Sequence, residues 1–278
     1  MIRVGRSYTL DVVKVVEFGV YVDAKELGEV LVPNRYLREK TVAGDKLDVF
    51  IYLDSKDRYI ATTQKPRAQL GEFAYLNVVD CNDVGAFLDW GLDKDVLVPF
   101  GEQHRPMEVG KSYLVYLYLD RIHGRITASS KIDKFILDDQ KHRYKAKQKV
   151  NVIIANTTDL GYRAIINNHI LGLFHNADVF ERLSFGDKKV AFIKDVRPDG
   201  RINLTFAGGQ ETRDKYSRMI LSALEKNSGH LSVHDKSSPD EIKKLFGMSK
   251  AAFKKAIGGL YKQRLISIDS DGIRLLEK

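Results

Sequence analysis

The sequence contains very little cysteine and no long apolar run. Cys81 is the single cysteine, so an internal disulfide framework is excluded and a reducing compartment fits. Residues 1–6 do not begin the unbroken apolar segment of a secretory signal peptide. No stretch approaches the ~18 consecutive apolar residues that a membrane-spanning helix needs. The sequence therefore predicts a cytoplasmic protein that does not span a membrane.

Motifs for catalysis and metal binding are also missing. Cys81 has no histidine nearby in the sequence and is expected to be an inert apolar group at a strand end. His230 and His234 lie four residues apart in a serine- and glycine-rich loop, without the glutamate that a zinc protease places between them. Gly200 and the pair Gly208-Gly209 are too isolated to form a phosphate-binding loop. We therefore expect no enzyme activity, no metal and no cofactor.

Positive charge, by contrast, is plentiful and unevenly distributed. The 278 residues carry a net charge of +8, and 44% of them are hydrophobic, which suits two to four globular domains. Residues 133–278 hold 27 Lys and Arg against 18 Asp and Glu, whereas residues 1–132 hold 18 against 19. A basic half favours a polyanionic partner, although a solvated basic surface would explain the same charge.

Three copies of one unit follow each other along the chain. Each copy has a glycine, then Pro or His fourteen residues later, and a second glycine twenty-five residues after the first. The three sets are Gly19, Pro33 and Gly44; Gly85, Pro99 and Gly110; and Gly161, His175 and Gly186. Successive copies are 66 and then 76 residues apart. We place the additional residues of the longer interval in residues 133–148, as a basic helical linker.

Each copy has the pattern of a small β-barrel. In the first copy, the alternation Val20-Tyr21-Val22 indicates a strand with one buried face, and four further β-branched or alternating segments surround it. The glycine at the start of this strand is expected to allow a sharp bend between sheet layers. Five short strands in ~65 residues describe an OB-type barrel.

After Gly209 the pattern becomes helical. Tyr216, Ile220 and Leu224 mark an amphipathic helix, and Ser238-Pro239-Asp240-Glu241 has the composition of a capping box. A turn with Ser249 as the next N-cap starts a third helix. Two apolar segments on either side of Asp269–Gly272 then predict a hairpin. This order of elements predicts a winged helix.

The repeated unit resembles the S1 RNA-binding repeat. The resemblance lies in Phe18–Val22, Leu31–Pro33, Gly44–Lys46 and Arg58–Ile60, with echoes in the other two copies. Together with the C-terminal segment, the chain resembles the bacterial conserved virulence factor B family over nearly its full length. The expected fold is mainly β: three tandem S1/OB-type five-stranded barrels followed by an α+β winged helix. The expected domains are residues 1–66, 67–132, 149–208 and 209–278, with the linker at residues 133–148.

The resemblance also implies which side chains contact single-stranded RNA. S1 repeats use an aromatic before the first glycine, an aromatic two residues after it, a histidine fourteen after it, and a late arginine. The matching residues are Phe18, Tyr21 and Arg58 in copy one, Phe87 and Arg125 in copy two, and His175 and Arg201 in copy three. Arg163 replaces an aromatic in copy three, where its guanidinium plane is an alternative stacking surface. No copy has the complete set.

Each candidate also has a structural interpretation. Phe18 would equally well pack at the barrel mouth, the arginines would equally well form ion pairs, and Trp90 is expected to pack in a loop. Copy two carries Asp89, Asp93 and Asp95 around Trp90 and is expected to contribute least to phosphate contact.

In the winged helix, the third helix carries Lys250, Lys254 and Lys255. Recognition helices of this type meet nucleic acid, although winged helices also dock proteins. The preferred interpretation is a non-catalytic protein that binds single-stranded RNA as a monomer and regulates gene expression after transcription or in translation. The ribosome or the RNA-degradation machinery is a candidate partner. The alternatives are a DNA-binding transcription regulator and an adaptor that docks on ribosomes or polymerase.

Overall fold

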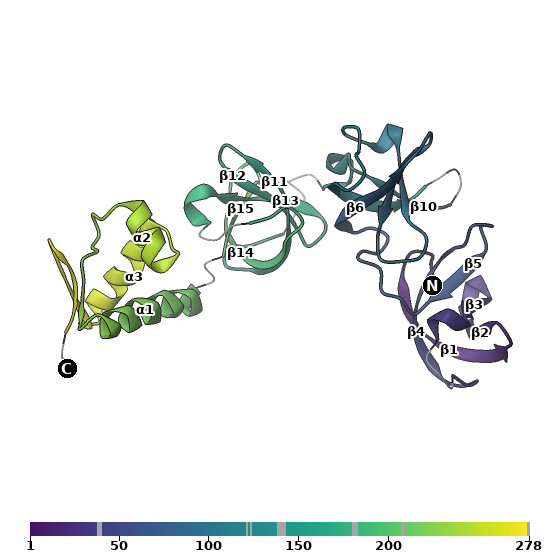
Figure 1. The fold of residues 1–278 in the computed structure, drawn as a ribbon, viewed down its shortest axis with the longest axis horizontal. Helices are drawn as coiled ribbons and strands as arrows, with labels where there is room; N and C mark the ends of the chain where they lie inside the picture. The colour runs from purple at the N-terminus through teal and green to yellow at the C-terminus, as the bar shows by residue number, and fades with distance from the viewer. Residues whose placement is uncertain are drawn as a thin grey trace. The chain divides into compact units, whose positions relative to one another are not determined.

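The computed structural model describes residues 1–37, 41–120, 122, 124–137, 143–179, 183–206 and 209–276. The chain forms two compact units, residues 1–136 and 137–278. Unit one contains two closed five-stranded barrels, and unit two contains a third barrel and the winged helix (Figure 1). The fold is therefore mainly β, as the sequence predicts.

The strands of the three barrels follow one plan. The strand order β1-β2-β3-β5-β4 recurs in barrel two as β6-β7-β8-β10-β9 and in barrel three as β11-β12-β13-β15-β14. The first barrel is built from β1 (Ser7–Val16), β2 (Gly19–Asp23), β3 (Glu29–Pro33), β4 (Lys46–Leu53) and β5 (Tyr59–Thr62). The second is built from β6 (Phe73–Cys81), β7 (Gly85–Asp89), β8 (Val96–Pro99), β9 (Ser112–Leu119) and β10 (Ile126–Ser129). The third is built from β11 (Lys149–Thr158), β12 (Gly161–Ile166), β13 (Ile170–His175), β14 (Lys188–Val196) and β15 (Ile202–Thr205).

The fourteen-residue spacing reflects strand pairing. Gly19 lies opposite Pro33 in the antiparallel β2–β3 ladder, and the same register pairs Gly85 with Pro99 and Gly161 with His175. A Cβ atom on Gly19 would stand 2.3 Å from the carbonyl oxygen of Val32, and the equivalent positions in the other barrels are as crowded. The neighbouring strand, rather than a bend, therefore requires glycine here.

The bend itself lies in the preceding strand. β1 has a β-bulge between Val12 and Lys14, and β6 and β11 have bulges at the matching places. The second repeated glycine holds this bulge: Gly44 has φ of 94° and donates its N–H to the carbonyl oxygen of Val12 at 2.8 Å. Gly110 and Gly186 form the same bond in their barrels. The second repeated glycine thus has the same hydrogen-bonding role in each barrel.

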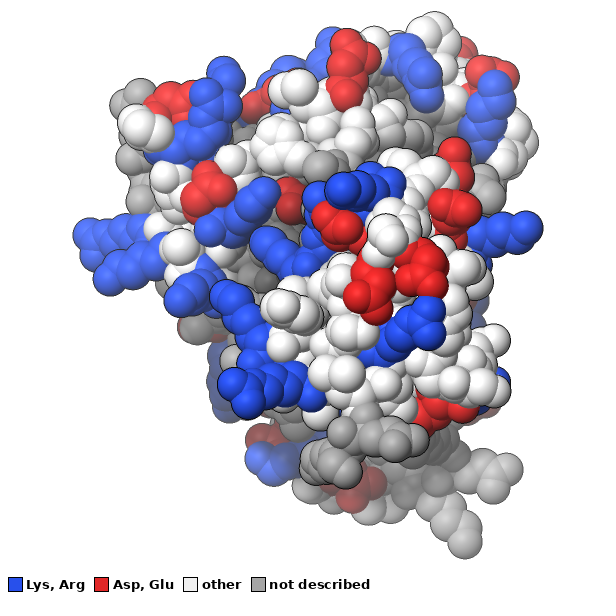
Figure 2. Space-filling view, turned by 90° about the vertical axis from the view of Figure 1, so that its left-hand side faces the viewer, with Lys and Arg blue, Asp and Glu red and all other residues white. Residues whose placement is uncertain are grey.

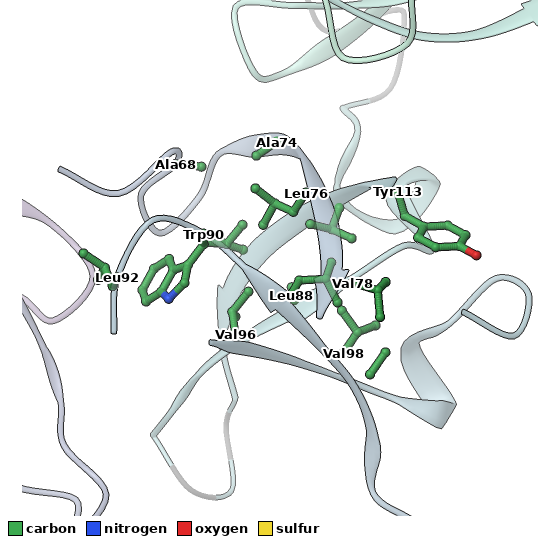
Figure 3. Packing of buried hydrophobic residues seen from close by; sticks show 14 of the residues in the cluster. Ala68, Ala74, Leu76, Val78, Leu88, Trp90, Leu92, Val96, Val98 and Tyr113 are labelled. Carbon is green, nitrogen blue, oxygen red and sulfur yellow. The ribbon is translucent and has the colours of Figure 1, made fainter. Parts of the chain in front are cut away.

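Barrel one has its own core and also contributes side chains to the hydrophobic cluster of barrel two, several of whose residues are shown in Figure 3. Phe50 and Tyr52 of β4 are buried together with the interior side chains of barrel two. The rings of Phe50 and Trp90 meet edge to face, with centroids 5.5 Å apart, and the indole N–H of Trp90 donates to the carbonyl oxygen of Lys94 at 2.6 Å. Trp90 therefore packs in a loop, as predicted, and joins the two barrels.

The winged helix contains α1 (Gly209–Lys226), α2 (Pro239–Phe246) and α3 (Lys250–Lys262), with β16 (His230–Leu231), β17 (Ile266–Asp269) and β18 (Gly272–Leu275). The capping box of Ser238 and Glu241 is present, and Ser249 caps α3. One expectation is wrong: His230 lies in a short strand at the edge of the wing sheet rather than in a loop, because it pairs with Arg274 of β18.

The segment predicted as a helical linker is described in part. Ile132–Phe135 forms a single 3₁₀ turn, residues 143–148 contain turns and extended backbone, and residues 138–142 lie outside the described residues. The ring of Phe135 stacks on Tyr116 of barrel two at 4.2 Å between centroids. The beginning of the segment therefore belongs to the packing of barrel two.

Candidate nucleic-acid interface

Barrel one presents both of its predicted aromatics at the surface. Phe18 lies in the β1–β2 turn with 57% of its surface exposed, which excludes its packing in the core. On β2, Val20 and Val22 are buried and Tyr21 between them is partly exposed, so the predicted alternation is confirmed. Exposed rings are the surfaces on which single-stranded nucleic acids stack their bases.

Barrel two has a different aromatic surface. Phe87 is partly exposed on β7, between Asp80 of β6 and Leu97 of β8. Val84 occupies the position of Phe18 and is 50% exposed. Phe100, directly after Pro99, is 58% exposed and was not among the predicted site residues. The available signal was that copies one and three carry asparagine at this position.

Barrel three holds its histidine in a polar chain. The Nε2 atom of His175 lies 3.0 Å from the Oδ1 atom of Asn203, whose amide donates to Asp195 at 2.8 Å. This chain orients the imidazole ring at the edge of β13. Arg163 on β12 is partly exposed, and Leu160 occupies the position of Phe18 with 64% of its surface exposed. The pairing of β12 with β13 brings Arg163 and His175 onto neighbouring strands.

The three late arginines all stand beside aspartates. Arg58 contacts Asp54 at 2.7 Å within its own turn, and the Nε atom of Arg201 lies 3.8 Å from Asp199. Arg125 makes two bonds to Asp57 of barrel one, at 2.5 and 2.7 Å. The hydrogen bond from Arg125 lowers the pKa of Asp57 below its ordinary value. All three guanidinium groups are more than half exposed, so a phosphate would have to compete with a carboxylate for each.

The acidic residues of barrel two face barrel one and the connecting segment. Asp93 accepts hydrogen bonds from Tyr36 at 2.7 Å and from Gln64 at 3.1 Å, and the bond from Tyr36 lowers the pKa of Asp93. Asp89 forms an ion pair with Arg67 at 2.7 Å. Burial, with Asp89 and Asp80 nearby, raises the pKa of Asp95. Asp93 therefore links barrel two to barrel one, and Asp89 links it to the connecting segment.

The winged helix exposes a basic helix. Lys254 and Lys255 are exposed on α3, whereas Lys250 is partly exposed and donates to the carbonyl oxygen of Lys236 at 3.2 Å. The Nζ atom of Lys254 lies 3.9 Å from Asp235. Figure 2 shows Lys and Arg side chains spread over the left-hand part of the face seen from this end. α3, the helix in the position of a recognition helix, thus carries exposed lysines.

The described residues contain no group of three or more His, Cys, Asp or Glu side chains arranged to hold a metal ion. Among the same residues, no helix is both long and apolar enough to cross a membrane. What the described surface does carry is exposed aromatic rings and cations, the two groups with which proteins bind single-stranded nucleic acid.

Comparison with known families gives the class of these domains. The S1 domain model matches residues 4–64 and 70–131, and the model of the CvfB-like winged helix domain matches residues 218–275. Both are nucleic-acid-binding domain types, and neither is a catalytic family. The protein is therefore a multidomain protein built from nucleic-acid-binding modules.

Similar proteins narrow this class. YitL of Bacillus subtilis (strain 168) is 29% identical over 270 residues, which cover 94% of this chain and 89% of YitL. Conserved virulence factor B of Staphylococcus aureus (strain N315) is 27% identical over 250 residues, covering 84% of this chain and 81% of that protein. A crystal structure described as a multidomain protein with nucleic acid binding domains, from Streptococcus pneumoniae TIGR4, is 24% identical with a TM-score of 0.42 and 98% coverage of both chains. The chain is therefore similar to the conserved virulence factor B family over most of its length, which confirms the resemblance predicted from the sequence.

Proposed function

We propose that this protein binds single-stranded RNA without catalysing a reaction on it, and that it regulates gene expression after transcription or in translation. One observation carries the proposal: exposed rings at the barrel edges, led by Phe18 and Tyr21, occur in the same chain as the exposed lysines of α3. Stacking recognises unpaired bases, and lysines neutralise phosphates in any sequence. A duplex reader has little use for exposed rings, because paired bases hide their faces.

We further propose that the four domains, residues 1–66, 67–132, 149–208 and 209–278, contribute different contacts with RNA. Barrel one, whose own residues carry almost no net charge, stacks bases through Phe18 and Tyr21. Barrel three and the winged helix contribute phosphate contacts, since the excess of Lys and Arg lies in residues 133–278. Arg163, His175 and Arg201 are the contacts proposed for barrel three. The protein acts as a cytoplasmic monomer, and its proposed partner is the ribosome or the RNA-degradation machinery.

Competition binding with the full chain tests the proposal. A labelled, unstructured RNA is displaced by unlabelled single-stranded RNA, by duplex DNA, or by neither. We expect single-stranded RNA to compete best, with an affinity that falls with salt at a log–log slope of about −3 to −4, as for ~4–6 neutralised phosphates on a single strand. Preference for duplex DNA would favour a transcription regulator instead, and no binding at low salt would favour a protein-docking adaptor.

A further inference from the structure

Phe100 stands where the other two barrels use asparagine to fasten a turn. In barrel one, the side-chain amide of Asn34 donates to the carbonyl oxygen of Glu17 at 2.6 Å. In barrel three, Asn176 donates to the carbonyl oxygen of Asp159 at 3.1 Å. These bonds tie the residue after Pro33 or His175 to the turn before the repeated glycine. A phenyl ring cannot make this bond, so barrel two has lost a stabilising contact and gained a surface ring.

The ring of Phe100 is as accessible as that of Phe18, at 58% against 57% exposed. It lies at the same end of its barrel, because Pro99 before it pairs with Gly85. Val84, on the other side of this pair, adds a second exposed apolar side chain. Barrel two thus has no aromatic at the position of Phe18, where Val84 stands, but it carries an exposed ring directly after the end of β8. A half-exposed phenyl ring contributes little to the hydrophobic core. Its burial under a flat aromatic partner is favourable, because apolar surface is removed from water and the rings can stack.

One cation contacts the turn that carries Phe100, although barrel two as a whole is acidic. Lys131 donates to the carbonyl oxygen of Gly101, the residue after Phe100, at 2.7 Å. Arg105 is exposed in the following loop, where its guanidinium carbon lies 5.6 Å from the ring centroid of Tyr113. Of the carboxylates, Glu102 is bonded to Lys134 and Ser129.

Strand direction separates this end of barrel two from the acidic end. β7 and β8 are antiparallel, so the start of β7 and the end of β8 lie together, with Val84 and Phe100. The end of β7 and the start of β8 carry Asp89 and Asp95 at the opposite end. Asp83, in the turn before Val84, is an exposed carboxylate at the Phe100 end of the barrel. The overall acidity of barrel two therefore does not describe the surface around Phe100.

We propose that Phe100 is a second base-stacking site, on which an unpaired nucleobase of single-stranded RNA lies while Arg105 and Lys131 contact the phosphates on either side. This inference rests on the proposed function and extends it to a residue outside the S1 set. It also replaces the expectation that barrel two contributes least to phosphate contact.

The first experiment compares Phe100→Ala with Val109→Ala in the full chain. Val109 is an equally exposed apolar residue of barrel two, at 59%, and is the matched control. We expect Phe100→Ala to weaken binding of a mixed-sequence, unstructured RNA by at least about fivefold, as stacking of one base predicts, and Val109→Ala to leave it unchanged. The same comparison with an abasic strand of equal length and charge should show no effect of Phe100→Ala.

A second variant reports contact directly. Trp90 is the single tryptophan and is buried, so Phe100→Trp adds one exposed indole whose fluorescence a stacked base quenches. We expect quenching on addition of RNA in Phe100→Trp and not in Val109→Trp, with affinity retained in Phe100→Trp.

The results separate the two proposals. If the full chain binds RNA and Phe100→Ala behaves like Val109→Ala, the Phe100 site is wrong and the proposed function stands. An equal loss on the abasic strand also overturns base stacking at Phe100, since a phosphate or structural effect would explain it. If the unmodified chain binds no RNA, the proposed function itself fails.

Discussion

Arg125 of barrel two donates two hydrogen bonds, from two of its nitrogens, to the carboxylate of Asp57 of barrel one. The pair spans the two barrels, and both side chains are about half exposed. Arg125, which the S1 resemblance implies as an RNA contact, thus also forms an ion pair between the two barrels. The two roles make different predictions, because an RNA phosphate and Asp57 compete for the same guanidinium group.

If Arg125 contacts RNA, removing its competitor should help. We expect Asp57→Asn to raise RNA affinity by about two- to fivefold, the range in which exposed ion pairs operate, and Arg125→Ala to lower it. In the double variant the effect of Asp57→Asn should disappear. Affinities measured by fluorescence anisotropy at one fixed salt concentration complete the cycle. Loss of affinity in Asp57→Asn would show that Arg125 serves the joint and not the RNA.

The aromatic pair of barrel one should carry affinity without charge. Replacing both Phe18 and Tyr21 with Ala removes two stacking surfaces worth ~1–3 kcal/mol each, so we expect binding at least about tenfold weaker with an unchanged salt slope. Val42→Ala, at a position 56% exposed in the same barrel, is the control. A thermal melt checks that the double variant folds. A stable double variant with full affinity would make barrel one a spacer or a protein-docking barrel.

The lysines of α3 should show the opposite signature. In the variant with both Lys254 and Lys255 changed to Ala, we expect the log–log salt slope to become shallower by about one unit with base preference unchanged. Lys46→Ala removes a surface lysine of barrel one that lies 3.4 Å from Asp11 and should leave the slope unaltered. A steep slope in the α3 variant would place the phosphate contacts elsewhere.

Two kinds of glycine should respond oppositely to alanine. Gly258 and Gly259 lie inside α3, and a Cβ atom added at either position meets nothing within 4 Å. We expect either alanine to stabilise the winged helix by ~0.5–1 kcal/mol, because glycine is a poor helix former. Gly85→Ala should destabilise barrel two by ~2 kcal/mol or more, since its Cβ would stand 2.3 Å from a carbonyl oxygen at φ of 152°. Thermal melts followed by circular dichroism measure both, and a destabilised Gly258→Ala would contradict the account.

Acid should loosen the joint between the barrels. Hydrogen bonds from Arg125 and Tyr36 lower the pKa values of Asp57 and Asp93 below their ordinary value of 3.8. A carboxylate with a lowered folded-state pKa stabilises the fold above its unfolded pKa, and that stabilisation is lost as the pH falls through the folded value. Trp90 fluorescence reports the joint. We expect Asp93→Asn to lower the melting temperature at neutral pH by about 1–4 °C and to flatten its decline below pH 3.8. An unchanged acid profile would mean that Asp93 does not hold the joint.

The barrels were predictable because all three copies repeat the same pairings at the same spacings. In the first copy Gly19 pairs with Pro33 and Gly44 donates to Val12, and the equivalent residues do so in the other two copies. The contact between barrels one and two was not predictable from the repeat spacing, although the sequence of β4 contains a sign of it. Residues 49–52 are buried at every position, whereas a strand with one wet face alternates; the second buried face belongs to barrel two.

The candidate site was predictable only where the S1 pattern supplies it. Exposure of Tyr21 follows from the alternation that the sequence displays, whereas the sequence left Phe18 open between the surface and the barrel mouth. The contact between Arg125 and Asp57 joins residues 68 apart in the chain, and no local pattern encodes such a contact. Phe100 lies one residue outside the family pattern, and its difference from Asn34 and Asn176 gains meaning only from its exposure in the folded barrel.

The burial of Phe50 against barrel two has a consequence for synthesis on the ribosome. β5 ends at Thr62, so barrel one can close as soon as that strand emerges, yet Phe50 lacks its edge-to-face contact with Trp90 until that residue follows. Translation adds ~5–20 residues per second, so this apolar face is open for a period on the order of seconds in every nascent chain. A stall between these two residues would leave a folded barrel with an uncovered aromatic face, the kind of surface that chaperones bind.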